Sequence, residues 1–241
     1  MTTHIGFRGL TDIPRPSPDL VQRLAAYAPP DLSDAMESGY TLDARVRPLY
    51  PTVRRFAGPA VTVATPRGAF NIIKFAMEQT RAGDVLVINA FGIEAFAVWG
   101  SNVTRGMRQR GLAGVVVDGA ARDPEEIQEL DFPVFARALA STSPPLEGPG
   151  EVNVPVACGG VVVRPGDIIV ADINGIVAVP LEGAEWVLER VAELKKKHEG
   201  IRPALDRGEV VNIGPITESL IRQGLSVDGG RRDKVASEMV E

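Results

Sequence analysis

Short runs of valine and isoleucine alternate with helical patterns through the middle of the chain, and this alternation most limits the possible folds. The runs are bounded by glycine, proline and aspartate, as β-strands usually are, and they lie at residues 57–65, 84–90, 114–119, 133–139, 159–171 and 175–180. Helical patterns separate several of them, at residues 69–81, 101–110 and 124–130. Strands that alternate with helices form α/β domains, so we predict an α/β fold. The helix-free stretch from 159 to 180 predicts antiparallel strand pairs as well.

Helices are also expected towards both ends of the chain. The segments "SPDLVQRLAAY" (17–27) and "DLSDAMESG" (31–39) predict two helices, the second closed by Gly39. The segment "LEGAEWVLERVAELKKKHEG" (181–200) predicts a long helix, because its apolar residues share one face; they are Ala184, Val187, Leu188, Val191 and Leu194. No low-complexity linker divides the middle of the chain. We therefore predict a helical N-terminal extension at 1–30, a single domain at 31–200 and a C-terminal extension at 201–241.

The composition is typical of a soluble globular protein, with 44% hydrophobic and 24% charged residues. No apolar run reaches the roughly 18 residues that a membrane span needs, and no signal peptide opens the chain. The net charge of -5 argues against nucleic-acid binding. The single cysteine, Cys158, suits a reducing compartment. We expect a cytoplasmic protein whose partners include neither nucleic acid nor a membrane.

Two histidines, His4 and His198, are too few for a histidine-rich zinc site, and they disfavour a Ser-His-Asp triad. Any metal bound by this chain is therefore expected to be a hard ion with oxygen ligands, such as Mg²⁺ or Mn²⁺.

The segment "WGSNVTRGMRQRG" (99–111) is a candidate binding site for an anion. Ser101 is a competent N-cap residue, and the backbone N–H groups that follow it have no partners within the helix. Gly100 lets a ligand approach closely, and the helix dipole favours a negatively charged group such as a carboxylate. The simpler alternative is a capped helix that binds nothing, and these residues alone favour it.

The segment "GVVVDGAARDPEEI" (114–127) contains the second candidate. A strand leads to Gly119, where we expect a sharp turn before Arg122, whose guanidinium matches a carboxylate or a 2-oxo acid in two-point contact. Asp123 precedes Pro124, and Glu126 follows three positions later, as in a capping box. Local sequence therefore favours a helix cap over metal binding or catalysis for Asp123, although one carboxylate can serve both roles.

Taken in order, several segments resemble the class II 4-hydroxy-4-methyl-2-oxoglutarate / 4-carboxy-4-hydroxy-2-oxoadipate aldolases, whose superfamily includes ribonuclease activity regulator A. The resemblance rests on the spacing from Gly100 to Arg122-Asp123 and on "LSDAMESG", "FAGPAVTV", "AGDVLVI", "DFPVFARALAS" and "PGDIIVADINGIVAVP". It covers about residues 31 to 200. It implies a swivelling β/β/α-type core, a divalent metal, and homotrimers or homohexamers with sites between subunits.

The resemblance also implies roles for individual residues. Arg122 would hold the carboxylate and keto oxygen of a pyruvyl group, and Asp123 would anchor the metal, Mg²⁺ or Mn²⁺. The substrate carboxylate would be received by backbone amides, those of Gly100, Ser101, Asn102 and Val103. Family sites use an acidic residue from a neighbouring subunit as well. Glu199, after the long helix, matches it best, and a solvated glutamate at a frayed helix end is an equal alternative.

The implied activity is that of a carbon–carbon lyase that releases pyruvate from a small 2-oxo acid, by a retro-aldol reaction or by decarboxylation of oxaloacetate. In either case a metal-stabilised enolate forms, and Arg122 adds positive charge where negative charge develops. Ser101 departs from the family pattern, since family aldolases commonly carry Asp or Glu there. Serine cannot match an acid's charge or basicity near neutral pH, which weakens the case for the standard aldol substrate. The alternative is a non-enzymatic, protein-binding regulator resembling ribonuclease activity regulator A, but the Arg122-Asp123 pair favours an enzyme.

Overall fold

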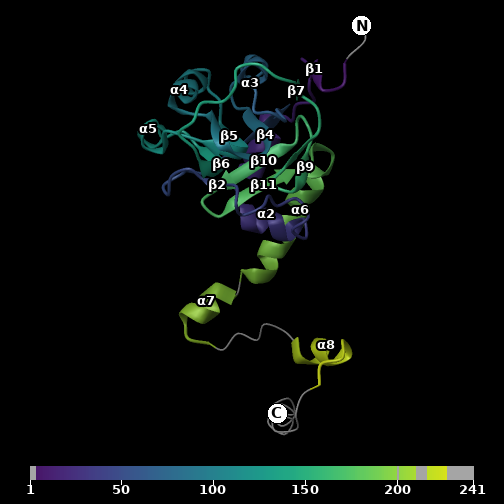
Figure 1. The fold of residues 1–241 in the computed structure, drawn as a ribbon. Helices are drawn as coiled ribbons and strands as arrows, with labels where there is room; N and C mark the ends of the chain where they lie inside the picture. Colours follow the sequence, from purple (N-terminus) through teal and green to yellow (C-terminus); the bar gives the residue numbers. More distant parts are fainter. Residues whose placement is uncertain (1–3, 200, 210–215, 227–241) are drawn as a thin grey trace, which may run out of the picture. The chain divides into compact units, whose positions relative to one another are not determined.

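A computed structural model describes residues 4–199, 201–209 and 216–226 (Figure 1). The chain divides into two units, residues 1–195 and 196–241, and the boundary falls within the long helix α6 (Ala184–His198). The second unit carries α7 (Ile201–Asp206) and α8 (Ile216–Arg222). Among the described helices, none is both long and apolar enough to cross a membrane. The domain boundaries at residues 30 and 200 stay predictions.

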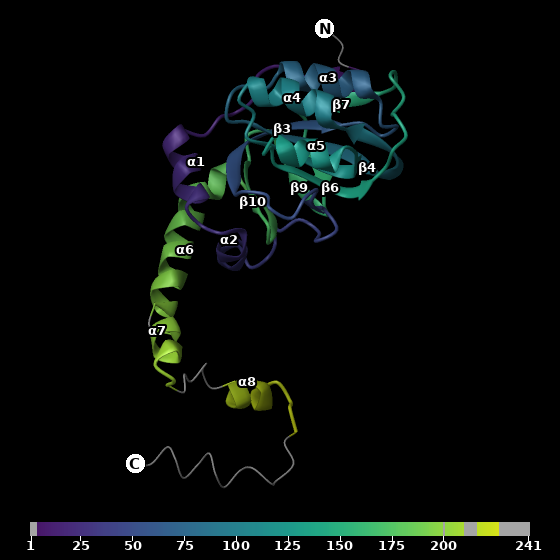
Figure 2. The same ribbon diagram turned by 90° about the vertical axis from the view of Figure 1, so that its left-hand side faces the viewer.

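Four parallel strands form the centre of the main sheet. In their order across the sheet they are β3 (Phe56–Ala64), β4 (Val85–Trp99), β5 (Gly114–Ala121) and β6 (Val134–Leu139). Right-handed crossovers between consecutive neighbours place every connecting helix on the same face. The connecting helices α3 (Phe70–Glu78), α4 (Ser101–Gln109) and α5 (Pro124–Glu129) accordingly lie together on one side (Figures 1 and 2). This confirms the predicted α/β alternation.

Antiparallel strands form a second layer, on the side of the sheet away from α3, α4 and α5 (Figure 1). β8 (Val156–Cys158) pairs with β9 (Val161–Val163), while β10 (Ile168–Asp172) pairs with β11 (Gly175–Val179) and with the first half of β3. Buried residues of these strands share one hydrophobic core with the parallel strands. The edges of the sheet are completed by β1 (Phe7–Gly9), β7 (Gly150–Val152) and β2 (Arg47–Pro48). The layers confirm the expected β/β/α-type arrangement and the antiparallel pairs predicted for residues 159–180.

The β10–β11 hairpin is buried on both faces. Ile169 and Ala171 pack into the main core, whereas Ile168 and Val170 pack into a second cluster with α1 (Pro18–Ala25), α2 (Pro29–Ala35) and α6. The apolar face predicted for the long helix packs into this second cluster. Burial of alternate residues on opposite faces explains why the sequence of this hairpin is almost continuously apolar.

Three expected boundaries are wrong. The strand expected at 84–90 continues to Trp99 as β4. α2 ends at Ala35 and not near Gly39, because Glu37 and Ser38 already adopt the left-handed conformation, with φ of 52° and 62°. β5 continues past Gly119 to Ala121, so the expected turn at Gly119 is absent. A Cβ atom at Gly119 would lie 2.8 Å from the Cβ of Ala90. The glycine there lets β4 pass close to β5.

Candidate active site

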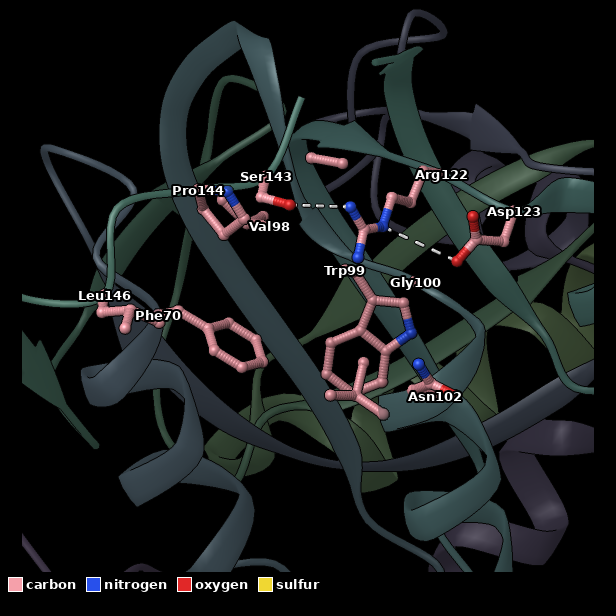
Figure 3. Close-up of a pocket in the computed structure, with 12 residues that line it drawn as sticks. Phe70, Val98, Trp99, Gly100, Asn102, Arg122, Asp123, Ser143, Pro144 and Leu146 are labelled. Atoms are coloured by element: carbon pink, nitrogen blue, oxygen red, sulfur yellow. Dashed lines mark hydrogen bonds and ion pairs between the residues drawn. The ribbon is translucent and has the colours of Figure 1, made fainter. Parts of the chain in front are cut away.

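The carboxyl ends of β4 and β5 border a cavity of about 280 Å³ (Figure 3). Trp99, the last residue of β4, pairs with Ala121, the last residue of β5. Gly100 and Arg122 therefore leave the sheet side by side, and the Arg122 N–H donates to the Trp99 carbonyl oxygen at 3.0 Å. Ligand sites of parallel α/β sheets lie at such strand ends, which makes this cavity the candidate active site.

The cavity brings together most of the residues predicted for the site. Five of them line it: Gly100, Asn102, Val103, Arg122 and Asp123. Ser101 is buried and contacts Asp123. Two segments of the sequence that were predicted separately thus lie against each other, although the role of each residue stays a prediction.

α4 begins at Ser101 with Gly100 as its N-cap residue, so the N-cap role expected for Ser101 is wrong. Gly100 has an extended backbone, with φ of -163°, that any residue can adopt, and it is needed for space. A Cβ there would lie 2.8 Å from Asp123 Oδ2 and 3.1 Å from Arg122 Cγ. Ser101 donates its backbone N–H and its hydroxyl to Asp123 Oδ2, at 3.0 and 3.1 Å. The Asp123 carboxylate therefore lies at the N-terminus of α4, where the helix dipole favours its charge.

Asp123 does not cap the helix that it precedes. It occupies the N-cap position of α5, but its backbone is left-handed (φ 60°, ψ 47°) and its side chain makes no capping bond to that helix. The capping box predicted for "DPEE" is therefore absent. This conformation costs roughly 1 kcal/mol for a residue other than glycine. It directs the carboxylate towards Ser101 and the cavity.

Arg122 lies between a loop and the Asp123 carboxylate. Its Nη1 donates to Ser143 Oγ at 3.0 Å, and its Nε lies 3.7 Å from Asp123 Oδ2. The side chain is 37% exposed, so further N–H donors are available to a ligand. Ser143 was not among the predicted residues. No local pattern marks it, because the contact joins positions that are far apart in the sequence.

Trp99 and Thr104 hold Gly100 in place. The Trp99 ring lines the cavity, and its indole N–H donates to Thr104 Oγ1 at 2.9 Å. The Thr104 hydroxyl in turn donates to the Gly100 carbonyl oxygen at 2.8 Å. Apolar side chains complete the wall, those of Phe70, Val98, Pro144 and Leu146 among them. Phe70, Pro144 and Leu146 come from segments in which the sequence predicted no site residues.

Asp123 supplies the carboxylate through which this cavity could hold a metal ion. Within the described residues, no group of three or more His, Cys, Asp or Glu side chains is arranged to bind a metal. Mg²⁺ usually keeps several waters and takes one or two carboxylates together with substrate oxygens. Asp123 fits such a ligand set, because both hydrogen bonds from Ser101 end on Oδ2 and Oδ1 is left for an ion.

Glu199 lies in the second unit, directly after α6. Its side chain is exposed, and its backbone N–H donates to the Lys196 carbonyl oxygen at 3.4 Å. The catalytic role expected for Glu199 stays a prediction.

Comparison with known sequences finds relatives named as aldolases. Residues 29–178 match the family model described as RraA-like, Aldolase/RraA. A Halalkalibacterium halodurans protein, provisionally named 4-hydroxy-4-methyl-2-oxoglutarate aldolase, is 35% identical over 190 residues, which cover 79% of this chain and 90% of that protein. A Thermus thermophilus protein named 4-hydroxy-4-methyl-2-oxoglutarate aldolase is 35% identical over 150 residues, which cover 62% of this chain and 90% of that protein.

Comparison with solved structures finds proteins that are named for inhibition of RNA processing. Streptomyces coelicolor RraAS2, described as an unusual member of the RNase ES inhibitor RraA protein family, aligns with a TM-score of 0.70 and 27% identity, covering 79% of this chain and 99% of that one. The RNA-processing inhibitor RraA from Thermus thermophilus aligns with a TM-score of 0.59 and 34% identity, covering 64% of this chain and 93% of that one. These four proteins therefore divide between aldolase names and names that refer to inhibition of RNA processing.

Proposed function

The chain belongs to the RraA-like (Aldolase/RraA) family, and on that premise we propose that it is a divalent-metal-dependent carbon–carbon lyase that releases pyruvate from a small 2-oxo acid. One observation carries the proposal: Arg122, Asp123 and the first turn of α4 border a single cavity. Mg²⁺ or Mn²⁺ is the proposed ion, with Asp123 as its protein ligand. A homotrimer or homohexamer is the proposed assembly, which light scattering would test.

Arg122 and the first turn of α4 hold the substrate in this proposal. The Ser101 N–H is already bonded to Asp123, so Asn102 and Val103 supply the backbone N–H groups for the substrate carboxylate. The Arg122 guanidinium contacts the carboxylate and the keto oxygen, and it stabilises negative charge that develops there. A bound metal ion supplies a Lewis acid for the 2-oxo group.

Both candidate reactions break the C3–C4 bond and leave its electron pair on C3, conjugated with the 2-oxo group. In the retro-aldol reaction the C4 hydroxyl proton is lost to solvent, C4 becomes a carbonyl carbon, and a proton added to C3 gives pyruvate. Oxaloacetate follows the same path but releases C4 as CO₂, with no hydroxyl proton to remove. One site can therefore serve both reactions.

Ser101 bears on the choice of substrate. Its hydroxyl donates to Asp123, and a serine hydroxyl is a poor proton acceptor near neutral pH. The retro-aldol reaction therefore depends on solvent to accept the C4 hydroxyl proton, whereas oxaloacetate decarboxylation needs no acceptor. Oxaloacetate is therefore the first substrate to test, ahead of the 4-hydroxy substrate for which the relatives are named.

Metal-dependent release of pyruvate tests this proposal. The protein is assayed with oxaloacetate and with 4-hydroxy-2-oxo acids, with Mg²⁺, with Mn²⁺ and with chelator, and a metal-only blank corrects for spontaneous decarboxylation. Arg122→Ala should lose activity at the same metal concentration. Arg108→Ala, on the exposed face of α4, is the matched control and should keep it. No metal-dependent turnover of any substrate above the blank would refute the proposal.

A protein-binding regulator is the alternative function, because two similar structures are named as inhibitors. The same protein preparation distinguishes the two functions. Inhibition of RNA cleavage by RNase ES, unchanged in Arg122→Ala and combined with no lyase activity, would favour the regulator.

A further inference from the structure

The cavity beside Arg122 has a polar end and an apolar end. Figure 3 shows Arg122 and Asp123 on one side, Phe70 and Leu146 on the other, and the Trp99 ring between them. Val98 and Pro144 extend the apolar wall. A ligand whose carboxylate lies at the polar end would therefore place its tail against hydrophobic side chains.

We propose that this site takes 4-hydroxy-2-oxo acids with an aliphatic tail beyond C4 and without a second carboxylate. The inference rests on the pyruvate-releasing function proposed above, and it specifies the other product. Cleavage of the C3–C4 bond leaves its electron pair on C3, the C4 hydroxyl loses its proton to solvent, and a proton returns to C3. The products are pyruvate and an aliphatic aldehyde.

The charges around the cavity support an uncharged tail. Among the residues that line it, all of them in the described part of the chain, Arg122 is the single cation, and it lies at the polar end. A carboxylate at the apolar end would exchange part of its hydration for contact with apolar side chains without gaining an ion pair there. A second cation, Lys74, lies close to the apolar wall, with its Nζ 5.1 Å from the centroid of the Phe70 ring. Lys74 is not among the residues that line the cavity.

The apolar wall is held in position by backbone hydrogen bonds. α3 has no side-chain N-cap, and its first N–H groups, those of Phe70 and Asn71, donate to the carbonyl oxygens of Pro145 and Leu146, each at 2.9 Å. The Ala97 N–H of β4 donates to the Thr142 carbonyl oxygen, also at 2.9 Å. The loop that carries Leu146 is therefore attached to both α3 and β4. A fixed wall selects ligands by the length and polarity of their tails.

A series of substrates tests the inference. Rates of pyruvate release are compared for 4-hydroxy-2-oxopentanoate, 4-hydroxy-2-oxohexanoate and 4-hydroxy-2-oxoheptanoate, and for 4-hydroxy-2-oxoglutarate as the dicarboxylate. We expect kcat/KM to rise about fourfold for each methylene buried, and the dicarboxylate to react at least about tenfold more slowly than the hexanoate. A preference for the dicarboxylate, or no dependence on chain length, would overturn the inference.

Three variants test whether the apolar wall causes the preference for an uncharged tail. Leu146→Arg adds a cation to the apolar wall at a side chain that is 62% exposed, and it should shift the preference towards the dicarboxylate by at least about tenfold. Leu10→Arg makes the same change at an exposed leucine outside the cavity and should leave the preference unchanged. Lys74→Met should also leave it unchanged. An unshifted preference in Leu146→Arg, or a dicarboxylate activity that depends on Lys74, contradicts the inference.

Oxaloacetate in the same assay distinguishes this inference from the proposed function. If neither oxaloacetate nor any hydroxy acid releases pyruvate, the proposed function fails and the inference fails with it. If oxaloacetate or the dicarboxylate is cleaved while the aliphatic series is not, the function stands and only the inference fails.

Discussion

The substitution Asp123→Asn tests whether Asp123 binds a metal ion or only accepts hydrogen bonds at the N-terminus of α4. Asparagine has the shape of aspartate and tolerates the left-handed backbone that Asp123 adopts, with φ of 60°. Its amide oxygen can still accept hydrogen bonds from Ser101. The substitution therefore removes the negative charge and keeps most of the local structure.

The hydrogen bonds that Asp123 accepts determine how much each variant should lose in free energy of unfolding. Its carboxylate is 31% exposed and accepts from Ser101 at 3.0 and 3.1 Å. Hydrogen bonds to charged groups contribute about 1.5–3 kcal/mol, and partial exposure places this site at the lower end. Asp123→Ala should therefore lower the free energy of unfolding by about 2 kcal/mol. Asp123→Asn should lower it by about 1 kcal/mol or less, and so should Ser101→Ala, which removes one hydroxyl donor.

Urea unfolding and metal-dependent pyruvate release, measured on the same samples, test this reasoning. Asp123→Asn should lose at least about a hundredfold in kcat/KM, because a neutral amide is a weak ligand for Mg²⁺. Ser101→Ala, the control with a similar loss of stability, should stay within about tenfold of the wild type. If Asp123→Asn and Asp123→Ala both keep wild-type metal-dependent turnover, Asp123 serves only as a cap for α4 and the metal assignment is wrong.

Three further substitutions test other parts of the structure. Gly100→Ala would place a Cβ 2.8 Å from Asp123 Oδ2, so we expect kcat/KM to fall at least about tenfold. Wild-type kinetics in this variant would show that the added methyl group does not displace Asp123. Burial raises the pKa of the Cys158 thiol above its ordinary value of 9.0. As the pH rises past that value, this thiol therefore ionises in the unfolded chain but not in the folded protein. The free energy of unfolding should then fall by up to about 1.4 kcal/mol per pH unit, and an equal slope in Cys158→Ala between about pH 9 and 10 would refute this. Arg15→Ala removes the ion-pair partner of buried Asp84 and should cost about 3 kcal/mol in urea unfolding, with kcat unchanged; unchanged stability would contradict it.

The pattern of apolar residues alone predicted strands that alternate with helices and antiparallel pairs near residues 159–180, whereas the β/β/α arrangement of layers was implied only by the family resemblance. The periodicity of apolar residues reports which faces are buried, and burial is the main term that favours folding. The predicted face of α6 packs as expected. The strands expected within 159–180 are present as β9, β10 and β11, and the structure shows that β10 and β11 are covered on both faces. Arg122-Asp123 could also be found, because the pair follows the strand predicted at 114–119 and precedes a helical pattern, whereas Gly100 was marked only by the helical pattern that follows it.

The contacts of these residues depend on the tertiary structure and could not be predicted from local sequence. Local sequence indicates that Asp123 caps α5, but the pairing of Trp99 with Ala121 brings the start of α4 beside it, and the carboxylate bonds to Ser101 instead. Leu146 joins the cavity through hydrogen bonds between the loop and α3. Such contacts depend on the register of paired strands and on the path of a loop. Neither leaves a periodic pattern in the sequence, because each joins positions that are distant along the chain.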